Sequence, residues 1–222
     1  MTQVRDVVIL SGVRTAIASF GGSLKDIAPT KLGAAVVREA VKRAGVEPGE
    51  VGSCVFGHVI NTEPKDMYLS RVASVEGGLP IATPAFTVNR LCGSGLQAIV
   101  TAAQQIMLGD VDSAVAGGAE SMSRAPYSLP SERWGAKMGD RKVIDMLVGA
   151  LTDPFGGGHM GITAENLSTK YQITRDEQDA FSIESHRRAI KARDAGYFND
   201  QIMPFEIETR KGKITYARDE HP

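Results

Sequence analysis

The sequence is poor in cysteine and carries almost no net charge. Its 222 residues contain two cysteines, Cys54 and Cys92, too few for a disulfide-stapled scaffold or a cysteine-rich zinc site. The 25 lysines and arginines nearly balance the 26 aspartates and glutamates, so the net charge is -1. A chain without a basic excess is not expected to bind the nucleic-acid backbone. We therefore expect no nucleic-acid partner and no metal.

Long hydrophobic runs and a signal-peptide layout are also lacking. The N-terminus, Met1–Asp6, has no charged stretch followed by an apolar one, and we expect no apolar run long enough to span a membrane. The hydrophobic share of 42% and the charged share of 23% are ordinary for a globular protein in water. These features predict a cytoplasmic protein with no membrane partner.

Up to residue 120 the chain alternates short apolar runs with helical patterns. Strands are expected at Val7–Leu10, within Val51–Ile60, at Ala85–Val88 and at Ser113–Ala116. Helices are expected over Thr30–Ala44, Asp66–Val75 and Ser94–Leu108. The first strand is a continuous apolar run, which predicts burial on both faces. This alternation predicts a layered α/β domain with a largely parallel sheet.

The pattern changes after Ser121. Residues 123–139 hold two prolines and the only tryptophan, Trp134, with little periodicity, which is typical of a long loop. We place a domain boundary here. The expected domains are an α/β domain over residues 1–121 and a mixed segment over residues 122–222.

Two further elements are expected in the second segment. Thr174 and Glu177 have the spacing of a capping box at the start of the clearest helix, and one face of this helix continues to Ala192. Ile214–Tyr216 has the composition of a short strand.

The sequence around Cys92 joins a strand, a cysteine and a helix within a few residues. Cys92 follows the expected strand Ala85–Val88 and stands just before the expected helix. The unpaired N–H groups and the positive end of a helix stabilise a thiolate, the reactive form of cysteine. Gly93 and Gly95 leave room for a thioester, and the Cys92 N–H can face a developing oxyanion. This is the layout of a nucleophile elbow with sulfur in place of oxygen.

A second interpretation of Cys92 stays open from this pattern alone, because free cysteines are often small buried hydrophobic residues. Cys54 lies in an apolar strand without flanking glycines, so we expect it to be such a residue. A disulfide between the two is not expected in a reducing compartment. His58 and His186 are expected to have structural or solvated roles.

Several segments resemble the thiolases, the family that makes and cleaves β-ketoacyl-CoA. The stretch Val88–Ile106 is similar to the acyl-enzyme signature of that family. Ile9–Leu24, Ala116–Ser123 and His159–Asn166 are similar to further thiolase segments, in the expected order. The similarity covers nearly the whole chain, and it is greatest toward bacterial acetyl-CoA acetyltransferases.

The resemblance implies roles for four residues. Cys92 is the expected nucleophile, which takes the acyl group from acyl-CoA as a thioester. Leu151, His159 and Met160 are expected to contact pantetheine, although core packing or a structural hydrogen bond would also account for them. The implied reaction is a reversible Claisen condensation of acetyl-CoA with acyl-CoA. Coenzyme A thioesters are then substrates, with no permanently bound cofactor and no metal.

The resemblance also implies the fold and the assembly. The expected fold is thiolase-like α/β, with a mostly parallel mixed sheet between helices over residues 1–121. Residues 122–222 are expected to form an incomplete α+β loop domain. Homodimers joined into homotetramers are expected, with contacts made by the loop 123–139.

The second half expected of a thiolase is absent from the 222 residues, which contain no Asn-Glu-Ala-Phe, Gly-His-Pro or Cys-x-Gly-Gly segment. In the family these segments supply a histidine that activates the nucleophile and a cysteine that deprotonates acetyl-CoA. The chain alone is therefore expected to be inactive. Two alternatives remain: a condensing enzyme like the β-ketoacyl synthases, and a catalytically silent fragment with a binding or assembly role.

Overall fold

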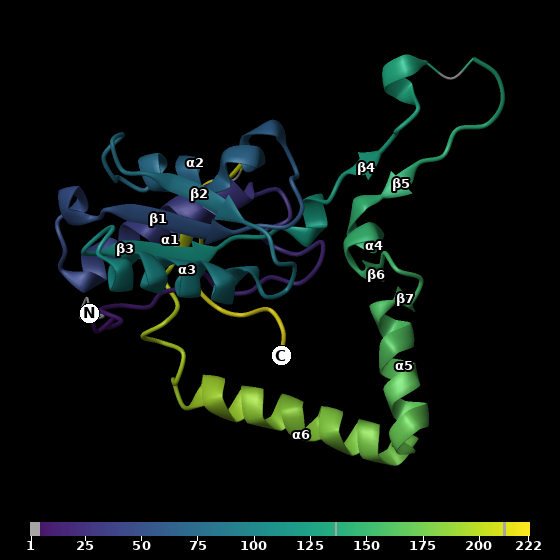
Figure 1. Ribbon diagram of the computed structural model, residues 1–222. Helices are drawn as coiled ribbons and strands as arrows, with labels where there is room; N and C mark the ends of the chain where they lie inside the picture. Colours follow the sequence, from purple (N-terminus) through teal and green to yellow (C-terminus); the bar gives the residue numbers. More distant parts are fainter. Residues whose placement is uncertain (1–4, 136, 211) are drawn as a thin grey trace. The chain divides into compact units, whose positions relative to one another are not determined.

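The computed structural model describes residues 5–135, 137–210 and 212–222. These residues form two compact units, whose elements are drawn in Figure 1. Unit 1 comprises the described residues up to Arg124 together with those between Asp200 and His221, and unit 2 runs from Ala125 to Asn199.

The centre of unit 1 is a parallel sheet in the order β2-β1-β3 (Figure 1). In chain order its strands are β1 (Ser53–Gly57), β2 (Ala85–Val88) and β3 (Ala114–Gly118). Cys54 of β1 pairs in register with Ala85 on one side and with Val115 on the other. The predicted layered α/β class with a parallel sheet is confirmed.

Helices cover both faces of this sheet (Figure 1). They are α1 (Pro29–Ala44), α2 (Leu69–Glu76) and α3 (Ser94–Leu108). Successive side chains of a strand point to opposite faces. Cys54 and Phe56 of β1 therefore belong to the core that α1 and α2 complete, whereas Val55 packs against α3 on the other face.

Element boundaries in unit 1 follow the sequence signals, and both β2 and α3 have their predicted bounds. The sequence offers Thr30 as the cap of this helix, but α1 begins at Pro29, so Thr30 lies inside the helix and does not cap it. Proline suits this first position because the N–H there has no partner within the helix. α1 ends at Gly45, whose φ of 65° is left-handed. The helix expected over Asp66–Val75 is a 3-10 helix, Pro64–Tyr68, continued by α2.

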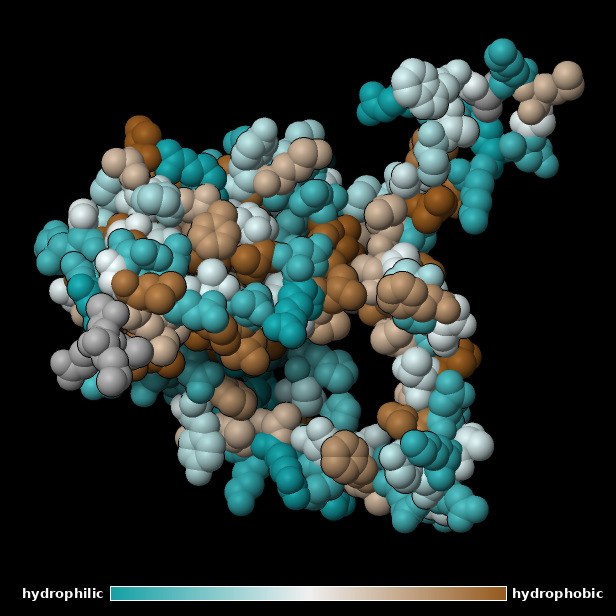
Figure 2. Space-filling view, in the orientation of Figure 1, coloured by the Kyte–Doolittle hydropathy of each residue, from teal (hydrophilic) through white to brown (hydrophobic). Residues whose placement is uncertain are grey.

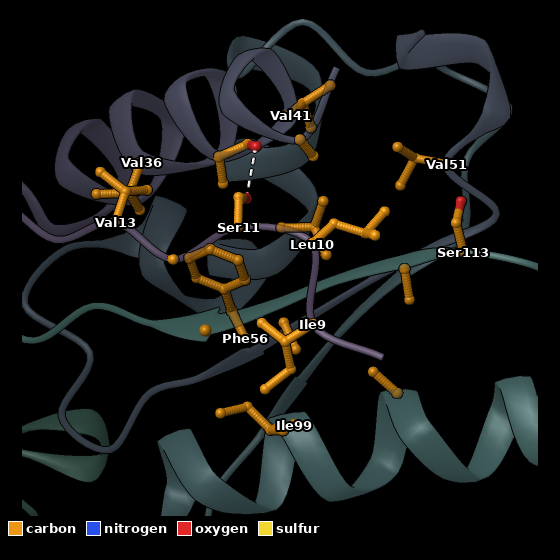
Figure 3. Close-up of a pocket in the computed structure, with 18 of the residues that line it drawn as sticks. Ile9, Leu10, Ser11, Val13, Val36, Val41, Val51, Phe56, Ile99 and Ser113 are labelled. Carbon is orange, nitrogen blue, oxygen red and sulfur yellow. Dashed lines mark hydrogen bonds between the residues drawn. The ribbon is translucent and has the colours of Figure 1, made fainter. Parts of the chain in front are cut away.

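The prediction of a buried strand at Val7–Leu10 is wrong. No strand is assigned there, and Val8, Ile9 and Leu10 are 73%, 82% and 61% exposed. A strand needs partners for its backbone N–H and C=O groups. Among the described residues, none pairs with this segment as a strand. It instead forms one wall of a cavity of about 750 Å³, whose other walls come from α1, α3 and β3 (Figure 3).

The stretch Leu91–Leu108 has 18 residues and a mean hydropathy of 1.2, enough to cross a membrane by length and composition alone. The sequence prediction that no such run exists missed it. In unit 1, Ala98 and Ala102 of this stretch are buried against Val55, but only 17% of the stretch is buried. Its opposite face is apolar and exposed, and hydrophobic side chains gather on the side of unit 1 where α3 lies (Figure 2).

Unit 2 consists of short elements. Its strands form two antiparallel pairs, β4 (Tyr127–Ser128) with β5 (Ile144–Asp145), and β6 (Thr152–Asp153) with β7 (Gly158–His159). Its helices are α4 (Met146–Ala150), α5 (Met160–Tyr171) and α6 (Arg175–Asp194). None of the described residues from Ala125 to Asn199 is buried. The capping box at the start of α6 is confirmed, whereas α5 was not predicted.

After Asp200 the chain belongs to unit 1 again. β8 (Phe205–Thr209) and β9 (Gly212–Tyr216) form an antiparallel hairpin, and the predicted strand Ile214–Tyr216 lies in β9. Tyr216 packs in a core with Ala16 and Leu32. The boundaries of these compact units differ from those of the predicted domains. The assignment of residues 122–222 to a loop domain stays a prediction.

Two acidic residues near the end of β9 hold a loop near the N-terminus. Asp219 forms an ion pair with Arg14, with 2.7 Å between Oδ1 and Nη1. The N–H groups of Ser19 and Ser23 donate to the Glu220 carboxylate at 2.7 and 3.0 Å. The hydrogen bond from Arg14 lowers the pKa of Asp219, and the hydrogen bond with Ser23 lowers that of Glu220.

Candidate active site

Cys92 lies in a tight turn between β2 and α3. The Leu91 N–H donates to Asn89 Oδ1 at 3.0 Å, and the Gly93 N–H donates to the Arg90 carbonyl at 3.1 Å. Leu91 has a φ of 46°, a left-handed conformation that costs a non-glycine residue on the order of 1 kcal/mol. Such strain persists only where the surroundings hold it, so the turn presents Cys92 from a fixed backbone.

Ser94 ties this turn to α3. Its hydroxyl donates to the Leu91 carbonyl at 2.6 Å and accepts the Arg90 N–H at 2.8 Å. Its own N–H also donates to the Leu91 carbonyl, at 2.9 Å. Serine is a common N-cap residue, but here Gly93 is the N-cap and α3 has no side-chain cap. The buried hydroxyl of Ser94 therefore holds the turn and not the helix end.

Cys92 is exposed, and space is open at Gly95, three residues further along the chain. A Cβ built on Gly95 would meet no heavy atom within 4 Å. A Cβ on Gly93 would approach the Arg90 carbonyl oxygen to 3.4 Å, which is ordinary contact. Open space therefore lies at Gly95 in the first turn of α3, and room for an acyl group at the Cys92 sulfur stays a prediction.

Cys54 differs from Cys92 in burial. Its side chain has no exposed surface, and burial raises the pKa of the thiol to about 11, although hydrogen bonds with Ser70 and Ser74 oppose the rise. A thiol with this pKa carries almost no thiolate at neutral pH, so it is a poor nucleophile. The interpretation of Cys54 as a small buried hydrophobic residue is confirmed, and both cysteines are free.

Leu151, His159 and Met160 come together in unit 2. The pairing of β6 with β7 sets Thr152 opposite His159, and the Met160 N–H donates to the Leu151 carbonyl at 2.8 Å. His159 caps α5, because its Nδ1 accepts the Gly161 N–H at 3.0 Å. The structural hydrogen bond left open for His159 therefore exists. His159 and Met160 are exposed, so both remain accessible to a ligand.

Sequence reasoning missed a polar cluster at the carboxyl end of β1. His58 is 3% exposed, and its Nδ1 lies 2.8 Å from the Ala119 carbonyl oxygen. Its Nε2 lies 4.0 Å from Oδ2 of Asp66, and Nδ1 lies 3.4 Å from Oε1 of Glu120. The structural role expected of His58 is confirmed, but nothing local in the sequence indicates these partners.

The cavity in Figure 3 is separate from the predicted site residues, none of which lines it. Its lining is mostly apolar, and the hydrogen bond drawn there runs from the Ser11 hydroxyl to the Ala40 carbonyl at 2.8 Å. Over the part of the chain that the structure describes, no cluster of three or more His, Cys, Asp or Glu residues could hold a metal ion.

The sequence of this chain is similar to a known protein family and to several characterised proteins. Residues 7–222 match the family described as thiolase, N-terminal domain. The chain is 63% identical over 217 residues to the beta-ketothiolase BktB of Cupriavidus necator, covering 98% of this chain and 55% of that protein. It is 45% identical over 221 residues to an acetyl-CoA acetyltransferase of Pseudomonas aeruginosa, covering 99% of this chain and 56% of that protein. The chain spans about half the length of these curated relatives.

Two solved structures resemble the chain over nearly its whole length. The crystal structure of the Bacillus anthracis acetyl-CoA acetyltransferase has a TM-score of 0.95 and 43% identity, covering 100% of this chain and 56% of that one. The structure of human mitochondrial 3-ketoacyl-CoA thiolase has a TM-score of 0.87 and 39% identity, covering 96% and 54%. The predicted thiolase-like α/β fold is confirmed by these likenesses.

Proposed function

The chain belongs to the thiolase family, and from this premise we propose that it serves acyl transfer between coenzyme A thioesters, with Cys92 as the nucleophile. The observation that carries the proposal is the position of the Cys92 thiol. It is exposed, it stands directly before the N-terminus of α3, and open space lies at Gly95. The positive end of a helix stabilises both a thiolate and the oxyanion that forms when it attacks.

The first step would form an acyl-enzyme. The Cys92 thiolate attacks the carbonyl carbon of acyl-CoA, a new carbon–sulfur bond forms, and the bond to the coenzyme A sulfur breaks. Coenzyme A leaves as a thiolate and takes up a proton, while the acyl group stays on Cys92. In the second step the carbanion of acetyl-CoA attacks this acyl group, and Cys92 leaves as a thiolate.

The second step needs a base that removes a proton from carbon. The resemblance assigns that base, and the histidine that activates Cys92, to a half that these 222 residues do not contain. General acid–base groups each contribute about 10²–10⁴-fold. We therefore propose that the 222-residue chain accepts an acyl group but does not synthesise or cleave acetoacetyl-CoA at a detectable rate. Adding the C-terminal half of a thiolase should restore turnover.

The roles of the remaining site residues are part of the same proposal. Leu151, His159 and Met160 lie on one hairpin–helix junction, which supports a shared role as pantetheine contacts. Assembly into homodimers and homotetramers is supported by exposed apolar side chains in the loop, since Trp134 and Met138 are 85% and 94% exposed. A cytoplasmic location and the absence of a permanently bound cofactor remain proposals.

Mass spectrometry after incubation with acetyl-CoA tests the proposal. We expect one acetyl group on Cys92 of the original chain and none on the Cys92→Ser variant. The Cys54→Ser variant should carry the acetyl group on Cys92 to the same extent as the original chain. Iodoacetamide should label Cys92 far faster than Cys54 in the folded chain, because Cys54 is buried and protonated. Absence of the acetyl adduct would favour the silent fragment. The family match already favours a thiolase over an enzyme like the β-ketoacyl synthases.

A further inference from the structure

We propose that His58 is a positioning residue for Cys92. Its ring and its backbone join the carboxyl ends of three strands beneath the turn that carries the thiol. This inference rests on the proposed role of Cys92 as nucleophile. His58 itself is buried, so it acts through the backbone and does not touch substrate.

Hydrogen bonds of His58 connect β1 to both neighbouring strands. The His58 N–H donates to the carbonyl of Val88, the last residue of β2, at 3.1 Å. The ring Nδ1 lies 2.8 Å from the carbonyl oxygen of Ala119, the residue after β3. A carbonyl oxygen only accepts, so Nδ1 carries the proton. The Ala119 N–H donates back to the Gly57 carbonyl at 3.2 Å, which closes the link.

This link lies directly behind the first residues of α3. A Cβ built on Gly57 would stand 2.6 Å from the carbonyl carbon of Ser94 and 2.8 Å from the Gly95 nitrogen. The backbone that precedes His58 is therefore in close contact with the backbone that follows Cys92. On the other side, Val88 stands four residues before Cys92. His58 and the preceding Gly57 thus contact the two ends of the segment that presents the thiol.

The surroundings of the ring determine its orientation. The ring is enclosed between two carboxylates, Asp66 beside Nε2 at 4.0 Å and Glu120 beside Nδ1 at 3.4 Å. Thr62 donates both its N–H and its hydroxyl to Asp66 Oδ2, each at 2.7 Å, and Val59 donates its N–H to Glu120 at 2.8 Å. Because hydrogen bonds hold both carboxylates, the ring cannot turn without displacing them.

The chemistry of this link suggests a matched pair of substitutions. In His58→Asn the side-chain nitrogen is bonded to Cγ, as Nδ1 is in histidine, so a donor remains near the Ala119 carbonyl. In His58→Leu the volume is largely kept but the donor is lost. A purely structural role predicts that both variants lose stability without any change in the Cys92 thiol of the folded chain.

The experiment measures the second-order rate constant for alkylation of Cys92 by iodoacetamide, resolved from Cys54 by mass spectrometry. The full 222-residue chain is used at a temperature where circular dichroism shows each variant folded. We expect His58→Leu to slow alkylation on the order of tenfold, because small displacements of a reacting group are costly. We expect His58→Asn to stay within about twofold of the original. Ser74→Ala, a change at another buried polar side chain of unit 1, should leave the rate unchanged.

Two results would overturn the inference: an unchanged rate in folded His58→Leu, or equally slow alkylation in His58→Asn and His58→Leu. If His58→Leu does not fold, His58→Gln replaces it, because its donor lies one bond further from the backbone. Equal rates for His58→Gln and His58→Asn would then contradict the proposal. Failure of the original chain to label Cys92 faster than Cys54 would instead contradict the proposed function.

Discussion

Unit 1 and unit 2 are ordered by different interactions. Unit 1 has a buried core on each face of its sheet, whereas none of the described residues of unit 2 is buried. The helices of unit 2 have local supports, including the capping box of Thr174 and Glu177 and an ion pair of 2.9 Å between Arg175 and Asp179. An isolated helix of 12 residues, the length of α5, is marginal in water. The proposed nucleophile, Cys92, therefore belongs to a unit with a packed core. The proposed pantetheine contacts, Leu151, His159 and Met160, belong to a unit that is held by local interactions.

Hydrogen exchange should show the largest difference between the units. Amide hydrogens of α1 and β1 exchange only when the core of unit 1 unfolds. Amide hydrogens of α5 and α6 exchange when the helix unfolds locally. Because core opening costs several kcal/mol, we expect exchange in α5 and α6 to be faster by roughly a thousandfold or more. Peptide-resolved mass spectrometry measures this directly. Equal protection in the two units would show that our comparison is wrong.

Replacing one leucine by alanine in each unit should show the same difference in core packing between unit 1 and unit 2. Leu69 has no exposed surface and packs with α1 and β1, so Leu69→Ala should lower the free energy of unfolding of unit 1 by about 2–5 kcal/mol. Leu167 in α5 is 52% exposed, so Leu167→Ala should change stability by less than about 0.5 kcal/mol. Urea denaturation followed by circular dichroism checks both, and a similar loss in the two variants would contradict the assignment.

Removal of a cap should affect unit 2 alone. The Thr174 hydroxyl accepts the Glu177 N–H at 3.3 Å, so Thr174→Ala should cost α6 about 1 kcal/mol. Ser182 lies within α6 and donates to the Gln178 carbonyl, so Ser182→Ala is a control that should not destabilise the helix. Exchange rates in α6 report the change. A cap variant that also loosened β1 would mean that the units are not independent.

Acid should weaken unit 1 by a smaller amount. The folded-state pKa of Asp219 lies below its unfolded value of about 3.9. Its contribution to stability is therefore complete above that unfolded value and is lost as pH falls through the folded pKa. Since the ion pair with Arg14 is partly exposed, with 29% and 14% of the two side chains accessible, we expect the contribution to be about 1 kcal/mol. Asp219→Asn should flatten the dependence of unfolding on pH between pH 5 and 2, roughly, in urea titrations.

Local signals in the sequence account for what could be predicted. The 3.6-residue periodicity of Ser94–Leu108 and the apolar run of β2 both depend on neighbours in the chain, and their bounds are as predicted. The prediction of a strand at Val7–Leu10 was wrong because hydrophobicity indicates a tendency to be buried. It does not indicate whether another strand will pair with the segment. α5 was missed because its cap is His159, a residue outside the common capping set.

In the candidate site, too, the local features were predictable from the sequence and the contacts between distant residues were not. The turn at Cys92 is local, so its place before α3 follows from the sequence. The partners of His58 are not local, since Ala119 is 61 residues away and is reached only through the order of the strands. The contact between Leu151 and Met160 likewise depends on the pairing of β6 with β7, two strands too short to be read from composition.

The ion pair between Arg14 and Asp219 has a consequence for synthesis on the ribosome. The two residues are 205 positions apart, so the loop near the N-terminus cannot take its final form until the last part of these 222 residues has emerged. The sheet is complete once β3 ends at Gly118. At about 5–20 residues per second, the ribosome needs roughly 5–20 s to go from there to Asp219. During that interval a nascent α/β core exists whose segment from Arg14 to Ser23 still lacks its contacts with Asp219 and Glu220 and is open to a chaperone.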